Sequence, residues 1–374
     1  MLPIAWAMLW HNRPRLGLTV VGIGVAFFLS AAQVGLLVGW CSTTSAIIRH
    51  AGVDVWVMAR QTPAFDYGTP IPRNRIYQAR SADGVAWAEG MFIGWNYWQR
   101  PDGRRVIIEL IGLDESSVGG PWQMQAGELE AVHGPHHVIV DELFLPSLGV
   151  SAIGDEAELL DNRAVIGGIS EGVRTFTAAP YIFTSIPSAI RYDKRYRDDE
   201  VTYVLVRCAA GFTPEEVRDA LARGLPSVEA LTSREFALRT VKYWMLETGM
   251  GITVVITALL GLGIGAVIIS QTLFAITQDH WANYATLLAL GFSRGQLARI
   301  VLMQSLVLGL GGIGLGTLAF GYAARASART AIPLQTTALV FAGLVGVTLL
   351  CCLLASLVSI RSLFKIDPVS VFRV

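Results

Sequence analysis

Four long runs without a charged residue dominate the hydrophobic pattern of the chain. They cover residues 16–40, 248–278, 300–324 and 330–360, with 25, 31, 25 and 31 residues. About 20 apolar residues cross the hydrocarbon core of a bilayer. Soluble domains rarely bury even one helix of this length. The pattern therefore predicts four transmembrane helices, at residues 16–40, 248–276, 299–324 and 336–360.

The first run has a second interpretation. Ser30-Ala31-Ala32 resembles a signal-peptidase site after a basic start. The apolar stretch continues for eight residues past Ala32, however. We therefore prefer an uncleaved anchor to a cleaved signal.

The charged residues gather between the first two runs, where 46 of the 58 lie between residues 41 and 242. Alternation of apolar and polar positions predicts strands in this region. The clearest are residues 53–58, 106–110, 138–140, 164–166 and 202–206. We expect an integral membrane α-helical protein with a large extracytoplasmic (periplasmic) α/β domain, residues 41–247, between transmembrane helices 1 and 2.

Two helices are predicted at the end of this domain. Thr213 is placed as the N-cap of residues 214–223, with Pro214 at the first helical position. Thr232-Ser233-Arg234-Glu235 fits a capping box for residues 233–247. We expect this second helix to lead into the second span as a stalk, with a bend at Gly249 and Gly251. The candidate transmission residues are Glu235, Arg239, Tyr243 and Glu247.

Basic residues set the expected orientation. Arg13 and Arg15 precede the first run, and Arg361, Lys365 and Arg373 follow the last. Since Lys and Arg favour the cytoplasmic side, both termini should be cytoplasmic. The cytoplasmic parts are then residues 1–15, 277–298 and 361–374, and residues 325–335 form a short outer loop. Arg325 and Arg329 in that loop weaken this asymmetry without reversing it.

The spans lack the groups of an ion pathway, because no run contains Asp, Glu, Lys, Arg or His. They are rich in glycine at GxxxG spacing, which is typical of close helix packing or dimerisation. These pairs are Gly35 and Gly39, Gly261 and Gly265, and Gly312 and Gly316.

The chain is not expected to be an enzyme. None of its three lysines lies in a GxxxxGK[ST] loop, so any nucleotide must be hydrolysed by another chain. The 29 basic and 29 acidic residues balance, which gives no support to nucleic-acid binding. We expect no cofactor or metal in this chain.

The outer region also contains four weaker patterns. Gly168-Ile169-Ser170-Glu171-Gly172 matches G-x-S-x-G, but the expected helix and a suitably placed later histidine are missing. His133, His136 and His137 flank a Gly-Pro turn and favour an exposed loop over a metal site. Cys41 and Cys208 could pair. The aromatic group Trp87, Phe92, Trp95, Tyr97, Trp98 and Trp122 is either core or a surface for a lipid-like substrate or a partner.

The loop between the second and third runs is the most informative segment. Trp281, Tyr284, Ala285 and Leu288 share one face of a short amphipathic helix. Gly291 is placed to close it in the left-handed conformation, followed by Phe292. Ser293 and Gln296 then form a capping box for the next helix. The helix either rests on lipid or docks a partner ATPase.

Three segments of the chain resemble one known family. Residues 283–293, NYATLLALGFS, look like a segment of MacB/FtsX-type ABC transporter permeases. Residues 367–373, DPVSVFR, resemble the ending of these permeases, and residues 5–15 resemble their start. The order of one span, a large outer domain and three spans is also similar, and the shorter outer region is closest to DevC-like permeases. This sequence departs from the family at Asn283 and Leu288, where many relatives carry Glu and Lys.

The resemblance implies a permease subunit that couples ATP hydrolysis by a separate ATPase to movement of the periplasmic domain and to export of a hydrophobic or amphipathic substrate. The implied partners are two ATPase subunits that bind ATP and Mg²⁺, a second permease copy and membrane lipid. A membrane-fusion protein and an outer-membrane channel are further partners, in a bacterial inner membrane. An FtsX-like regulator of a hydrolase and a lipoprotein-release permease stay open, as does a ligand sensor from another class. The expected docking residues are Asp279, His280, Trp281, Tyr284, Leu287, Leu288, Gly291, Phe292 and Arg294.

Overall fold

The computed structural model describes residues 2–11, 13–177, 179–279 and 281–363. The chain divides into two compact units. A helical unit comprises residues 1–39, 253–328 and 333–374, and an α/β domain comprises residues 40–252 and 329–332. His280 and residues 364–374, which carry the C-terminal signature, lie outside the described residues.

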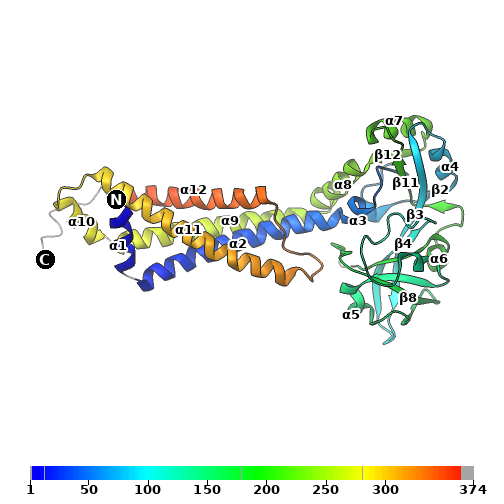
Figure 1. Cartoon of the computed structure of the whole chain (residues 1–374), viewed down its shortest axis with the longest axis horizontal. Helices are drawn as coiled ribbons and strands as arrows, with labels where there is room; N and C mark the ends of the chain where they lie inside the picture. The colour runs from blue at the N-terminus through cyan, green and yellow to red at the C-terminus, as the bar shows by residue number, and fades with distance from the viewer. Residues whose placement is uncertain (1, 12, 178, 280, 364–374) are drawn as a thin grey trace. The chain divides into compact units, whose positions relative to one another are not determined.

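Four helices of the described chain are long and apolar enough to cross a membrane. They are α2 (Arg13–Thr44), α9 (Met250–Asp279), α11 (Arg294–Ser327) and α12 (Ala338–Leu363). Figure 1 shows these helices alongside one another. Two short helices, α1 (Leu2–His11) and α10 (Trp281–Ala289), belong to the same unit. The four predicted membrane helices are therefore confirmed, whereas α1 was not expected as a separate helix.

The predicted glycine pairs lie where helices of this chain touch. A Cβ atom at Gly265 would lie 2.7 Å from Oγ of Ser30 in α2, and one at Gly316 would lie 2.6 Å from the carbonyl oxygen of Gly24. Gly261 faces Gln33 and Gly312 faces Ile23 in the same way, while Gly35 and Gly39 approach Phe320 and Pro333. All six positions thus serve packing within the chain. A second copy would have to use other faces.

The α/β domain is built on a ten-stranded mixed sheet. Its strand order is β12-β1-β11-β3-β4-β9-β6-β8-β5, and β7 pairs with β3 and β8. The pairs β4–β9 and β6–β8 are parallel, and the other pairs are antiparallel. The strands are β1 Val55–Ala59, β3 Val85–Gln99, β4 Arg105–Leu113, β5 Met124–Ala126, β6 His137–Asp141, β7 Glu156–Leu159, β8 Asn162–Ser170, β9 Tyr181–Ser185, β11 Tyr203–Cys208 and β12 Val228–Thr232; β2 (Ile71–Pro72) and β10 (Glu200–Val201) form a separate ribbon.

Helices cover the sheet and close both of its apolar faces. They are α3 Ala46–His50, α4 Asn74–Arg80, α5 Leu145–Leu148, α6 Ile186–Tyr192, α7 Pro214–Gly224 and α8 Ser233–Lys242, with short turns η1 Phe65–Tyr67, η2 Leu129–His133, η3 Glu142–Phe144 and the π-helical η4 Tyr243–Glu247. The predicted capping boxes of α8 and α11 and the predicted N-cap of α7 at Thr213 are all present. The predicted α/β domain between the first and second membrane helices is confirmed.

The aromatic group of the sequence does not form one surface. Phe92 and Trp98 belong to the core cluster on one face of the sheet, and Trp87 and Trp122 pack on the cluster of the other face. A strand turns successive side chains to opposite faces, and so β3 places Phe92 and Trp98 on one face and Trp87 on the other, while Tyr97 is exposed. The interpretation as a shared binding surface is therefore wrong.

Candidate functional site

The short helix α10 has sharply defined boundaries. Gly291 adopts the left-handed conformation with φ of 91°. Its N–H donates to the Leu288 carbonyl at 3.0 Å, and the Phe292 N–H donates to the Leu287 carbonyl at 3.1 Å. This is a Schellman motif, in which glycine is favoured because it has no Cβ atom. Ser293 and Gln296 then cap α11, so the turn between α10 and α11 has a fixed geometry.

One face of α10 packs inside the helical unit. Tyr284 and Ala285 are buried with Leu297, Ile300 and Ala5 in one apolar cluster. The Tyr284 hydroxyl donates a 2.7 Å hydrogen bond to Oε1 of Gln304 in α11. Trp281, Leu287 and Leu288 are partly buried against the same cluster.

This packing corrects the role expected for Tyr284. The amphipathic pattern identified the apolar face of α10, but this face binds α11 and α1 of the same chain. Tyr284 has no exposed surface with which to contact a partner. It is a positioning residue, which holds the helix from its inner side.

The opposite face of α10 is exposed. It carries Ala282, Asn283, Thr286 and Ala289, and it ends at Leu290, of which 71% is exposed. Among the expected docking residues, Gly291 and Arg294 are exposed and Phe292 is half-buried.

Asp279 lies at the end of α9, just before α10. Its Oδ2 forms a 3.1 Å ion pair with Arg15 at the start of α2. Both side chains also line a largely apolar groove of about 530 Å³ between α2 and α9. Asp279 therefore joins two helices of the unit.

The expected stalk residues lie on two different kinds of helix. The α-helix ends at Lys242, and residues 243–247 form a π-helical turn in place of the predicted continuous helix. Glu235 closes the capping box and forms an ion pair with Arg218 of α7. Arg239 pairs with both carboxylate oxygens of Glu229 in β12, at 2.8 and 2.6 Å. These contacts fasten α8 to the α/β domain.

The π-helical turn is fastened by aromatic contacts. The indole N–H of Trp244 donates a 2.9 Å hydrogen bond to Oδ2 of Asp66 in η1. Phe176 packs on Trp244 with ring centroids 4.5 Å apart, and Tyr67 packs on Tyr243 at 5.7 Å. Glu247 is exposed, and Gly249 with φ of 76° follows before α9 begins. The break expected at Gly249 is thus present at the end of the π-helical turn.

A buried pair of carboxyl groups lies next to this turn. Asp66 and Glu109 are 4% and 0% exposed. Burial raises the pKa of Asp66 to about 6, although Trp244 donates a hydrogen bond to it. Burial, and next the charge of Asp66, raise the pKa of Glu109 well above its usual range. No local pattern indicated this pair, because Glu109 lies in an ordinary strand pattern.

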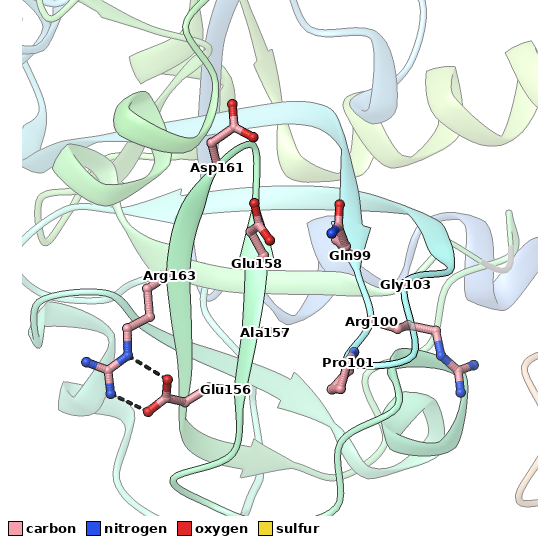
Figure 2. A pocket seen from close by; sticks show the side chains of 9 residues that line it. All are labelled: Gln99, Arg100, Pro101, Gly103, Glu156, Ala157, Glu158, Asp161 and Arg163. Atoms are coloured by element: carbon pink, nitrogen blue, oxygen red, sulfur yellow. Dashed lines mark hydrogen bonds and ion pairs between the residues drawn. The ribbon is translucent and has the colours of Figure 1, made fainter.

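The α/β domain also carries an open hollow of about 450 Å³ at the tips of its hairpins. Figure 2 shows its side chains, with Arg163 in a two-bond pair with Glu156 and Arg100 directed away from them. Glu158 and Asp161 complete a charged lining. Its lining residues include no Ser, Thr, Cys, His or Lys.

The residues of the weaker sequence patterns have ordinary structural surroundings. Ser170 lies at the end of β8 and donates a 3.2 Å hydrogen bond to Asp141. Cys41 and Cys208 are both free thiols. His133 is hydrogen-bonded to Ser117 at 2.9 Å. None of these positions forms a catalytic arrangement in the described part of the chain.

Two family models cover most of the chain. Residues 16–223 match the model described as MacB-like periplasmic core domain, and residues 254–368 match FtsX-like permease C-terminal. The chain belongs to the MacB/FtsX-like family of ABC transporter permeases. This confirms the family resemblance inferred from the sequence. Members of this family are permease components that work with ABC ATPase partners, which usually supply the ATPase activity.

Solved structures give weaker likenesses to this MacB/FtsX-like permease. The extracellular domain of the ABC-type transporter YknZ from Gram-positive bacteria is 11% identical, with a TM-score of 0.37, over 48% of this chain and 98% of that one. The periplasmic region of MacB from Actinobacillus actinomycetemcomitans is 9% identical, with a TM-score of 0.37, over 50% of this chain and 92% of that one. No curated protein matches the sequence. The family assignment therefore rests on the two family models.

Proposed function

We propose that this chain is the transmembrane subunit of an ABC export machine and that α10 is its docking helix for a separate ATPase. ATP and Mg²⁺ would be bound by that partner, in two copies, and the permease would act with a second copy of itself. In this proposal the chain spans a bacterial inner membrane with both termini in the cytoplasm. Movement of α10 is passed to the spans and then to the α/β domain, which acts on a hydrophobic or amphipathic substrate.

The anchoring of α10 is the observation that carries this proposal. The Tyr284–Gln304 hydrogen bond, the Schellman motif at Gly291 and the capping box at Ser293 join α10 to α11 without a flexible loop. A force on the outer face of α10 therefore acts on α11 directly. A helix that only rested on lipid would not require so rigid a connection.

The outer face of α10 supports contact with a protein. It presents small or uncharged side chains around Leu290, and Arg294 begins the next helix beside it. Such a surface can enter an apolar groove, with Leu290 as its anchor. Asn283 stands where relatives carry a carboxylate. Its uncharged side chain fits an apolar contact better than a contact between opposite charges.

The composition of the spans supports a hydrophobic or amphipathic substrate. Their charge-free runs offer no hydrophilic path for an ion or a charged solute. A hydrophobic or amphipathic molecule need not cross through such a path, because it can reach the α/β domain from the membrane. Transport by movement of that domain agrees with this composition.

Co-purification tests the docking proposal. Wild type and Leu290→Lys would be extracted in mild detergent together with bound proteins. Lysine is compatible with a helix C-terminus, so the variant should fold. We expect an ABC ATPase with wild type and at least about tenfold less with the variant, equivalent to about 1.4 kcal/mol.

Tyr77→Asp is the matched control, because Tyr77 is 64% exposed but lies on α4 of the α/β domain. It should retain the ATPase. Equal recovery from all three proteins would contradict the proposal. A co-purified membrane-fusion protein would favour export, and a co-purified hydrolase would favour regulation.

A further inference from the structure

Glu109 is buried at the middle of the ten-stranded sheet without a hydrogen-bond donor. It lies on β4, paired with Trp95 of β3 and Tyr181 of β9. Its side chain is fully buried, and neither carboxyl oxygen has a partner among the described residues. An ionised carboxylate in this environment would be very unfavourable, and so Glu109 must hold a proton or share one.

Asp66 is the neighbour with which Glu109 can share that proton. Trp95, which is paired with Glu109 across the sheet, donates its indole N–H to the Asp66 carbonyl, and the charge of Asp66 acts on the Glu109 carboxyl group. Two carboxylates contain no donor, so a bond between them exists only when one of them carries a proton. Buried carboxyl pairs elsewhere hold a single proton between them for this reason.

The described residues around the pair provide no charge that could replace the proton. The titratable groups that face the pair are tyrosines, which are neutral at ordinary pH. They are Tyr67 on η1, Tyr181 on β9 and Tyr203 on β11. The ion pairs found among the described residues include neither Asp66 nor Glu109.

Asp66 also connects the sheet to the end of the stalk. Its Oδ2 accepts the Trp244 indole N–H at 2.9 Å, and its carbonyl accepts the Trp95 indole N–H at 2.9 Å. The neighbouring Phe65 N–H donates to Oγ1 of Thr240 in α8 at 3.2 Å. The turn η1 therefore lies between β4 on one side and α8 with the π-helical turn on the other.

We propose that Asp66 and Glu109 form a proton-binding site that controls whether the π-helical turn 243–247 is held on the α/β domain. With one proton present, protonated Glu109 donates to the Asp66 carboxylate, which accepts from Trp244. Release of that proton to solvent leaves two buried like charges, which repel each other.

Asp66 is the group that moves when the proton leaves. Glu109 is fixed by strands on both sides, whereas Asp66 lies on a three-residue turn. Its displacement removes the acceptor of Trp244 and frees the turn that precedes Gly249 and α9. This device does not depend on ATPase docking, and either inference can fail without the other.

Fluorine NMR tests the proposal on the full chain in lipid nanodiscs. All tryptophans would be labelled as 5-fluorotryptophan, and Trp244→Phe would assign the signal of interest. We expect the Trp244 signal to shift with pH between about 5 and about 9, the range in which a raised carboxyl pKa falls. A Trp244 signal that stays constant over this range would overturn the proposal.

Glu109→Gln identifies the group responsible. The glutamine amide donates to Asp66 at every pH and removes the like charge. The pH midpoint of the Trp244 signal shift should fall by at least about one pH unit, which is a tenfold change in proton affinity. An unchanged midpoint would overturn the proposal.

Glu89→Gln is the matched control, because Glu89 is also a buried glutamate but accepts hydrogen bonds from Trp87 and Ser116. It should leave the midpoint unchanged, and an equal shift in both variants would count against the site. If Glu109→Gln fails to fold, Asp66→Asn takes its place, since asparagine can still accept from Trp244. Persistence of the wild-type midpoint in Asp66→Asn would likewise overturn the proposal.

Discussion

Tyr284 in α10 and Gln304 in α11 are joined by a buried 2.7 Å hydrogen bond between their side chains. The bond lies within an apolar cluster, where each partner would be costly to leave unpaired. It fixes the position of the short helix on the span that follows it. Contacts on the buried side of α10 therefore hold the proposed docking surface in place.

Removing the Tyr284 hydroxyl should loosen α10. Tyr284→Phe leaves Gln304 without its donor, which costs about 1–3 kcal/mol. We expect hydrogen exchange of the α10 amides to increase accordingly. The double variant Tyr284→Phe/Gln304→Leu should recover much of the loss, because no polar group is then unpaired. Equal exchange in the single and double variants would show that the bond has no such role.

Gly291 should resist substitution, unlike its neighbour Gly295. Its φ of 91° is unfavourable for any residue with a Cβ atom, so Gly291→Ala should cost about 1–2 kcal/mol and fray the end of α10. Gly295 lies in the first turn of α11 with space around it, and Gly295→Ala should be neutral or slightly stabilising. The thermal unfolding midpoint and the amount of co-purified ATPase would be compared between the two variants. Equal effects at the two positions would contradict the Schellman geometry.

The Arg239–Glu229 pair should make the attachment of α8 dependent on pH. The Arg239 hydrogen bonds, and next its charge, lower the pKa of Glu229. Stabilisation by this pair is therefore present above the unfolded-state pKa of about 4.3 and is lost as the pH falls through the lower folded-state pKa. Since both side chains are about one-third exposed, we expect a contribution of only about 1–2 kcal/mol.

Glu229→Gln is the variant that checks this dependence. Protection of the α8 amides should be lower than in wild type at neutral pH and equal to it below the folded-state pKa. A constant difference at both pH values would assign the effect to packing and not to the ion pair.

Gly316 and Gly314 offer a matched pair within α11. A Cβ atom at Gly316 would lie 2.6 Å from the Gly24 carbonyl oxygen, whereas Gly314 has open space around it. Gly316→Ala should force α2 and α11 apart and cost about 1–3 kcal/mol. Gly314→Ala should be tolerated. Thermal unfolding in detergent would compare the two, and similar midpoints would argue against this helix contact.

The spans and the helix ends could be predicted because their signals are local. A charge-free run is sufficient to identify a membrane helix, and Gly291 or the Thr232–Glu235 box defines a helix end through contacts a few residues away. The strand positions also followed from alternation within a few residues. These features depend little on the rest of the fold.

Features that depend on distant residues could not be predicted. The apolar face of α10 was identified correctly, but the sequence does not state whether α11 or a partner covers it. Glu109 and Asp66 are 43 positions apart, and only the sheet brings them together. The π-helical turn follows from the packing of Trp244 on η1, which no local pattern contains.

Photo-crosslinking from the end of α10 is the most direct test of the docking proposal. A photoreactive amino acid would replace Leu290, which is 71% exposed, and in a control Leu318, which is 74% exposed on the span α11. Irradiated membranes would be analysed by mass spectrometry of the crosslinked product. The account predicts a product with an ABC ATPase from position 290 and none from position 318. Absence of an ATPase at position 290, or equal products from both positions, would contradict it.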